Sequence, residues 1–149
     1  MSPFDAVKQQ LSTIVPFAKH TGVVIDEITA EGATCHLDQR GEVENHIQSM
    51  HAGAIFVLGE QASGAAFAGA FLDRMMTVRP VAASAEIKYL KVAKGTLVAK
   101  AQLDGDAEAL KATLDAEGRV RFPVNVSLTD STGDEVATLV VDWHLKKLG

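Results

Sequence analysis

The stretch NHIQSMHAGAIFVLGE, from Asn45 to Glu60, brings together three side chains that could take part in a reaction. His51 follows Asn45 by six residues, and Glu60 follows His51 by nine. Glu60 is the one charged residue in an apolar segment that extends to Leu72, and a buried carboxylate is costly unless it is paired, neutralised or used. Desolvation raises the pKa of such a carboxylate, which makes Glu60 a candidate base or nucleophile at neutral pH.

The segment that carries Glu60 predicts a helix over about residues 52–72. Its length would allow it to cross a bilayer. Its apolarity, however, comes largely from alanine and glycine, and Glu60, Gln61 and Ser63 lie at its centre, where an ionised residue is expensive. We therefore expect a helix buried inside a folded domain and no membrane partner.

The rest of the sequence predicts the elements that surround this helix. Apolar residues at helical spacing predict a short amphipathic helix over about residues 4–19, and residues 106–113 predict a brief helical turn. Six segments have strand patterns, two before the long helix and four after it: GVVIDEI, ATCHLDQR, VAASAEIKYLKV, GTLVAKAQLD, GRVRFPVNVSLTD and EVATLVVDWHLKKL. This order is an α+β pattern, in which an antiparallel sheet holds its main helix against one face.

Composition limits the class of protein. The 149 residues, 47% of them hydrophobic, fit one domain over residues 1–149. A net charge of −5 gives no general attraction to nucleic acid. Cys35 has no second cysteine to pair with and no secretory signal is visible, so we expect a cytoplasmic protein. The five histidines show no zinc-ligand spacing, and we expect neither a metal nor a cofactor.

The spacing of Asn45, His51 and Glu60, the order of the strands and the segment IKYLKVAKG resemble the hotdog-fold thioesterases. The likeness covers about residues 20–146 and is greatest to the phenylacetate-type (PaaI-like) branch, which hydrolyses acyl-coenzyme A. It implies an antiparallel sheet wrapped around a long central helix. It also implies protomers that pair edge to edge, as a homodimer or a dimer of dimers, with acyl-coenzyme A bound in active sites at the dimer interface.

The resemblance also implies roles for individual residues. Glu60 matches the nucleophile or general base, His51 the histidine before the helix, and Asn45 the amide that positions the thioester or the water. Ala52 and Gly53 stand at the expected start of the helix. Unpaired N–H groups and the positive end of the helix dipole are suited there to an oxyanion, which thioester hydrolysis generates.

Two positions depart from the family pattern. Ala52 stands where a glycine commonly follows the histidine, although alanine still supplies the N–H group. Ala82 stands where many relatives carry a serine or threonine on the strand after the helix. Ser84 lies two residues further on, which is the same face of a regular strand, so it is the candidate substitute unless the role is absent.

Lys88, Lys91 and Lys94 form the densest basic cluster of the sequence. Lysine is a point charge suited to phosphate, so these three residues are candidates for binding the phosphates of coenzyme A. The alternative interpretation is a solvated strand end that protects a sheet edge from aggregation.

Other interpretations remain open for the site and for the function. Glu60 could be satisfied by buried polar partners or by a second chain, His51 could cap the helix, and Asn45 could form a turn. The same fold also hosts dehydratases and hydratases that act on acyl thioesters, and a non-catalytic acyl-coenzyme A-binding protein is a further alternative. Release of a free thiol separates hydrolysis from both.

Overall fold

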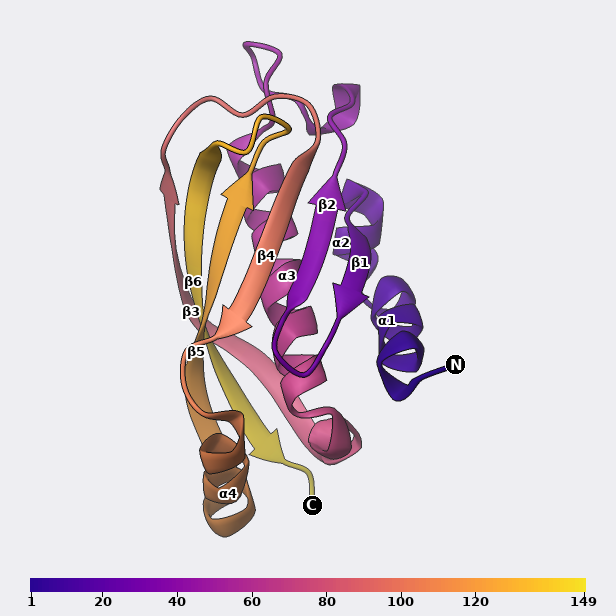
Figure 1. The fold of residues 1–149 in the computed structure, drawn as a ribbon, viewed down its shortest axis with the longest axis vertical. Helices are drawn as coiled ribbons and strands as arrows, with labels where there is room; N and C mark the ends of the chain where they lie inside the picture. The colour runs from indigo at the N-terminus through magenta and orange to yellow at the C-terminus, as the bar shows by residue number, and fades with distance from the viewer.

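The computed structural model describes all residues from 1 to 149 (Figure 1). Its helices and strands, in chain order, are α1 (Pro3–Ile14), α2 (Pro16–Thr21), β1 (Val24–Ile28), β2 (Ala33–Leu37), the short 3-10 helix η1 (Gly41–Val43), α3 (Ala52–Ala70), the 3-10 helix η2 (Leu72–Thr77), β3 (Val78–Tyr89), β4 (Leu97–Leu103), α4 (Ala107–Glu117), β5 (Arg119–Thr129) and β6 (Glu135–Lys147).

The six strands form one antiparallel sheet in the order β1-β2-β4-β5-β6-β3. Alternating residues of the central strands are buried; in β6 these include Leu139, Val141, Trp143 and Leu145. The sheet therefore has a buried inner face and a largely polar outer face. β1 and β3 are its two edge strands.

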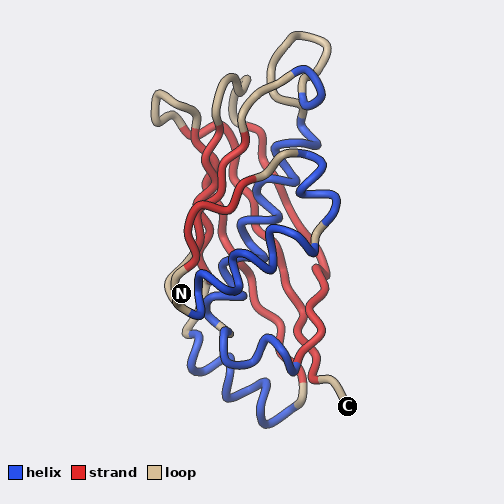
Figure 2. The backbone as a smooth tube through the Cα atoms, turned by 90° about the vertical axis from the view of Figure 1, so that its right-hand side faces the viewer, coloured by secondary structure: helices blue, strands red, loops and turns tan.

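Helix α3 lies along the inner face, where it contacts β1, β2, β4, β5 and β6 (Figures 1 and 2). Small residues allow this close approach. A Cβ atom added to Gly59 would lie 2.7 Å from the side chain of Leu139, and one added to Gly69 would lie 2.2 Å from the carbonyl oxygen of Thr29. An antiparallel sheet wrapped around a long central helix is the hotdog fold, so the predicted fold class is confirmed.

Two predicted helices differ from those observed. The helix expected over residues 4–19 is divided into α1 and α2, because proline at position 16 has no N–H to continue α1 and instead occupies the first position of α2. The brief turn expected over residues 106–113 is the longer helix α4, which Asp106 caps by accepting a hydrogen bond from the amide of Glu108.

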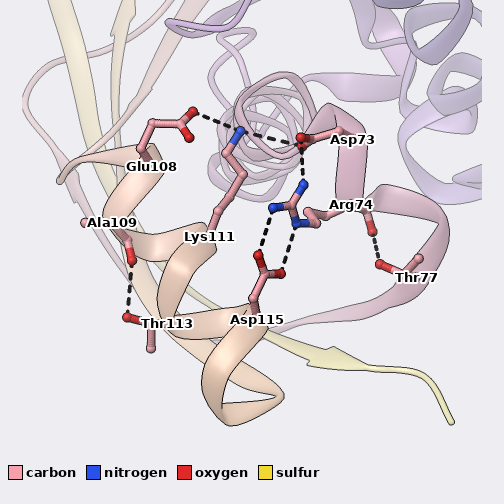
Figure 3. A network of polar contacts seen from close by, with 8 residues as sticks. All are labelled: Asp73, Arg74, Thr77, Glu108, Ala109, Lys111, Thr113 and Asp115. Atoms are coloured by element: carbon pink, nitrogen blue, oxygen red, sulfur yellow. Dashed lines mark hydrogen bonds and ion pairs between the residues drawn. The ribbon is translucent and has the colours of Figure 1, made fainter.

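Ion pairs hold α4 against η2 at the end of the molecule opposite the start of α3 (Figures 1 and 3). Arg74 of η2 donates two hydrogen bonds to the carboxylate of Asp115 on α4, at 3.0 and 2.8 Å. Lys111 of α4 lies 3.5 Å from Asp73 and 3.0 Å from Glu108. Each cation of this network therefore has an acidic partner.

Edge strand β3 is unusually open to solvent. It pairs only with β6, and most of its residues are exposed on both faces of the sheet. Val81 and Tyr89 are 50% and 48% exposed. A long exposed edge with apolar side chains is a template for pairing with another strand.

Candidate functional site

His51 is the N-cap of α3. Its Nδ1 atom accepts a hydrogen bond of 2.8 Å from the backbone amide of Gly53, so the neutral ring carries its proton on Nε2. The side chain is exposed. The capping interpretation of His51 is thus correct, and the free Nε2 atom still faces solvent with a donor available.

The backbone amide of Ala52 is a free donor at the start of α3, since no group of the chain accepts a hydrogen bond from it. The carbonyl oxygen of the same residue is held in place, because the hydroxyl of Tyr89 donates a hydrogen bond of 2.9 Å to it. An exposed, oriented N–H group beside the positive end of a helix is suited to an oxyanion. The neighbouring amide of Gly53 is already used by His51.

Glu60 lies on the only side of α3 that the rest of the chain leaves uncovered. The residues of α3 that are not buried are Ala52, Gly53, Phe56, Val57, Glu60 and Gly64. Their spacing places them along one seam of the helix. The carboxylate forms no ion pair or hydrogen bond within the chain, and burial raises its pKa above the ordinary value. A lone carboxylate of this kind holds a proton more readily than an exposed one.

Two hydrogen bonds fix the backbone of Glu60. The hydroxyl of Ser63 donates to the carbonyl oxygen of Glu60 at 2.6 Å, and the indole Nε1 of Trp143 donates to the same hydroxyl at 3.0 Å. The indole ring also lies against Phe67, with ring centroids 4.7 Å apart. The helix turn that carries Glu60 is therefore anchored to β6.

Ala52 and Glu60 of one chain are too far apart to act on one carbonyl group. Eight residues of helix correspond to about 12 Å along the axis. The free amide at the helix start points away from the helix body, so a bound oxyanion would lie further still from Glu60. In this arrangement, one chain therefore does not bring the Ala52 amide and the Glu60 carboxylate to the same carbonyl group.

Asn45 closes the loop that leads into α3. Its side-chain amide donates to the hydroxyl of Ser49 at 2.8 Å, and its Oδ1 atom accepts from the amides of Ile47 and Ser49 at 3.1 and 3.0 Å. The turn interpretation of Asn45 is thus correct. The polar atoms of the side chain are thus used for contacts within the loop.

Ser84 does not share a face with Ala82, so this expectation is wrong. A β-bulge between the two residues shifts the register of β3 against β6. Ala82 pairs with the inward residue Trp143, whereas Ser84 pairs with Asp142, whose side chain lies on the outer face. The extra residue of a bulge interrupts the alternation from which the face was predicted.

The three candidate lysines have different surroundings. Lys91 is paired with Asp134 at 2.7 Å and with Asp130 at 3.4 Å, so its charge is already balanced. Lys88 lies 4.0 Å from Glu86, and both side chains are largely exposed. Lys94 forms no ion pair and is exposed.

A hollow of about 710 Å³ lies beside the start of α3. Its apolar wall includes Phe17 of α2 and Phe56 and Val57 of α3, and its polar side includes His51 and Arg40. Phe17 is 68% exposed, so this aromatic ring faces the hollow and solvent more than the core. The arrangement offers an apolar surface next to the free amide of Ala52.

Comparison with known proteins assigns the sequence to a family. The family model described as "Domain of unknown function (DUF4442)" matches residues 5–145. The chain belongs to the DUF4442 family. No curated protein matches the sequence.

Solved structures share the fold of this DUF4442 chain. PA5026 from Pseudomonas aeruginosa, described as a protein of unknown function and "Probable Thioesterase", is 24% identical with a TM-score of 0.86, over 99% of this chain and 97% of that one. The E. coli PaaI protein from the phenylacetic acid degradation operon is 19% identical with a TM-score of 0.72, over 99% and 94%. The protein OLEI01261 from Chlorobaculum tepidum, of unknown function, is 13% identical with a TM-score of 0.82, over 97% and 94%. The similar structures, PaaI among them, thus confirm the hotdog fold that the sequence resemblance implies.

Two further features bear on the site of this DUF4442 protein. No group of three or more His, Cys, Asp or Glu side chains is arranged to hold a metal ion. None of the helices combines the length and the apolarity that crossing a bilayer requires.

Sequence reasoning missed Tyr89 and Phe17 as site residues. Both come from elements remote from Glu60 in the sequence, and neither belongs to a short motif. In the sequence, the only indication of a role for Tyr89 is its position near the end of the predicted strand VAASAEIKYLKV.

Proposed function

We propose that this protein is an acyl-coenzyme A thioesterase that hydrolyses the thioester of an acyl or aryl group. One observation carries the proposal: α3 presents a free, oriented amide at Ala52 and, along its single uncovered seam, a carboxylate at Glu60 that has no partner in the chain. The thioesterase names carried by structures of the same fold support it.

The proposed active unit is a homodimer formed through β3, which can associate further as a dimer of dimers. The exposed β3 edge and the uncovered seam of α3 lie on neighbouring parts of the chain's surface. In one protomer, the edge has no second neighbouring strand and the seam has no element that covers it. Antiparallel pairing of two β3 strands about a twofold axis would place the seam of one α3 beside the start of the other. Each site would then combine His51 and Ala52 of one protomer with Glu60 of its partner.

The reaction follows from these positions. The thioester oxygen accepts a hydrogen bond from the Ala52 amide, which stabilises the negative charge that develops there. Glu60 takes a proton from a water molecule while the water oxygen adds to the carbonyl carbon. Collapse of the tetrahedral intermediate breaks the C–S bond, and the thiolate takes up a proton. His51 Nε2 lies at the helix start as a donor to this leaving group or to the oxyanion.

Glu60 acting as a nucleophile is the second route. Its carboxylate oxygen would add to the carbonyl carbon, expel the thiolate and form a mixed anhydride that water then hydrolyses. A single turnover in ¹⁸O-labelled water separates the two routes. Label incorporated into Glu60 indicates the nucleophile. Label found only in the acid product fits the base and also an anhydride that water attacks at the acyl carbon, and trapping of an acylated Glu60 with hydroxylamine separates these two.

The hollow beside α3 is the proposed acyl site, with Phe17, Phe56 and Val57 as its apolar wall. Aromatic and aliphatic surface of this kind suits an aryl or alkyl chain. Gly53 forms part of the same hollow, where the absence of a side chain leaves room next to His51. Lys88 and Lys94 remain proposed contacts for coenzyme A, whereas the acidic partners of Lys91 compete for its charge.

The proposal is tested by measuring free thiol released from short, medium, long and aryl acyl-coenzyme A substrates. Glu60→Gln is the test variant, and Glu31→Gln, at an exposed glutamate in the β1–β2 connection, is the matched control. We expect release by the wild type and the control and a loss of about 100-fold or more in the test variant. Absence of thiol release from every substrate, or full activity of folded Glu60→Gln, would contradict the proposal. Consumption of a thioester without thiol release would indicate a dehydratase or hydratase instead.

A further inference from the structure

The C-terminal end of helix α2 is held by one side chain. The helix has only six residues, too few to be stable on its own. Arg40 donates a hydrogen bond of 2.5 Å from Nη1 to the carbonyl oxygen of Thr21 and one of 3.0 Å from Nη2 to that of His20. The last carbonyl groups of a helix lack partners within it, and a cation is favourable at that end. Arg40 therefore supplies both the donors and the charge that α2 needs.

The backbone at Gly22 leaves room for this guanidinium group. Gly22 ends α2 with a φ of 101°, in the left-handed region. A Cβ atom added to it would lie 2.5 Å from Nη1 of Arg40 and 3.5 Å from the side chain of Leu37. Glycine therefore meets a conformational and a steric requirement at this position. The contact between Arg40 and α2 is thus a closely packed part of the fold.

Arg40 also connects α2 to the start of α3. Its Nε atom lies 3.3 Å from the carboxylate of Glu42 in η1. The next residue, Val43, is buried, and its carbonyl oxygen accepts a hydrogen bond of 2.8 Å from the backbone amide of His51. Helix α2 and the N-cap of α3 are therefore attached to the same short segment.

Phe17 is the aromatic residue that this arrangement positions. Its carbonyl oxygen accepts a hydrogen bond of 2.8 Å from the hydroxyl of Thr21, so Phe17 belongs to the turn that Arg40 holds. Helix α2 contacts α3 (Figure 1), and Phe17 lines the hollow of about 710 Å³ together with Phe56 and Val57. The ring is 68% exposed. An apolar ligand that covers such a ring removes aromatic surface from water, which favours binding.

We propose that Phe17 is a specificity-determining residue that favours acyl groups long enough to reach α2, and that Arg40 is the positioning residue that holds it there. The inference rests on the proposed thioesterase function and names the acyl class preferred at the same site. An acetyl group bound with its carbonyl oxygen at the Ala52 amide occupies only the part of the hollow beside the helix start. An octanoyl chain extends further along the apolar wall and covers part of the Phe17 ring.

The test measures chain-length preference. The readout is the ratio of kcat/KM for thiol release from octanoyl-coenzyme A to that from acetyl-coenzyme A. We expect the wild type to prefer the octanoyl substrate, and the ratio to fall about tenfold in Phe17→Ala and in Arg40→Met, because both lose the contact with the chain. Leu148→Ala and Arg119→Met, at exposed residues outside the hollow, are the controls and should keep the wild-type ratio. A merely structural defect lowers both kcat/KM values together and leaves their ratio unchanged.

A double variant tests whether Arg40 acts through Phe17. In that case Phe17→Ala/Arg40→Met has the same ratio as Phe17→Ala, whereas independent effects multiply to a fall of about 100-fold. If circular dichroism shows that Arg40→Met is unfolded, Arg40→Lys takes its place, since lysine keeps the charge but lacks the fork that reaches two carbonyl groups. Absence of octanoyl preference in the wild type, an unchanged ratio in either single variant, or multiplied effects in the double variant would overturn the inference. None of these results affects the thioesterase proposal.

Direct binding keeps the inference testable if no thiol is released. The acyl-coenzyme A substrates then stay intact, and calorimetric titration gives the ratio of their dissociation constants for the same set of variants. Tighter binding of octanoyl-coenzyme A by the wild type, lost in Phe17→Ala and in the Arg40 variant, supports the role of Phe17 even though the thioesterase proposal fails. Equal binding of the two ligands by the wild type, or binding of neither, overturns the inference.

Discussion

The hydroxyl of Tyr89 donates a hydrogen bond of 2.9 Å to the carbonyl oxygen of Ala52, which fastens the end of edge strand β3 to the first residue of α3. Residues 37 positions apart in the sequence thereby fix one peptide unit. The free N–H of Ala52, proposed as oxyanion donor, lies in the adjacent peptide unit, and the strand is the one proposed to pair with a partner. Dimer formation through β3 would therefore stabilise the geometry of the oxyanion site.

Replacement of Tyr89 by phenylalanine tests this relationship. The ring remains and only the hydroxyl is lost, so we expect the free energy of unfolding to fall by about 1 kcal/mol. We expect kcat to fall by roughly tenfold with little change in KM, because a displaced oxyanion donor weakens the transition state more than substrate binding. Steady-state kinetics of thiol release provides the measurement. An unchanged kcat in Tyr89→Phe would show that the Tyr89 hydroxyl does not support the oxyanion donor.

The raised pKa of Glu60 predicts the pH dependence of activity. Burial raises this pKa, and the ionised form is the one that acts as base or nucleophile. Activity should therefore be present at neutral pH and fall as the pH is lowered through a value above that of an exposed glutamate. A profile of kcat/KM from pH 4 to 8 measures it. An acidic limb at the ordinary pKa of glutamate would show that Glu60 is fully solvated in the working site.

The same shift predicts that Glu60 costs stability at neutral pH. The folded state has the higher pKa, so it binds more protons than the unfolded state between the two pKa values, and stability decreases as the pH rises through that window. Glu60→Gln, which resembles the protonated side chain, should raise Tm at pH 7, and the gain should disappear below the unfolded pKa. Glu31→Gln should leave Tm unchanged. A lower Tm for Glu60→Gln at pH 7 would indicate a partner that stabilises the carboxylate.

Most elements of the fold could be predicted from the sequence. Helix α3 was predicted within two residues because a long run of small apolar residues is unsuited to any exposed element, and the strands followed from alternation and turn residues. The division of the first helix at Pro16 and the true face of Ser84 were not predicted. Each depends on a local backbone irregularity, and a bulge such as the one after Ala82 leaves no mark in a hydrophobic pattern.

The candidate site was predicted in part for a related reason. His51 and Glu60 were recognisable because both lie on one helix, so their spacing is visible in one segment. Tyr89 and Phe17 are brought into place by the packing of β3 and α2 around α3, which brings together residues far apart in the chain. The same spacing implies a separation of about 12 Å between Ala52 and Glu60 along the helix axis, so the sequence also contained the evidence that one chain keeps the two groups apart.

The buried hydrogen bond between Trp143 and Ser63 predicts a stability effect away from the reacting groups. Ser63→Ala leaves the indole N–H without an acceptor in a site where Ser63 is 0% and Trp143 only 7% exposed. We expect the free energy of unfolding to fall by about 1–3 kcal/mol. Urea unfolding followed by the fluorescence of this single tryptophan measures the change. Ser131→Ala, at an exposed serine in the β5–β6 turn, is the control, and equal stability of the two variants would rule out the anchoring role.

A shared active site predicts that two inactive variants restore each other. In a dimer of His51→Ala with Glu60→Gln, one site has both defects, whereas the other combines the intact His51 of one protomer with the intact Glu60 of its partner. Random pairing on co-expression should therefore return up to about a quarter of wild-type activity, since half of the dimers are mixed and each has one intact site. The measurement is thiol release by the unselected mixture of co-expressed chains, and selection of mixed dimers through two different tags should raise the value to about half of the wild type. If each protomer held a complete site, both chains of the pair would be defective and activity would stay at the level of the single variants.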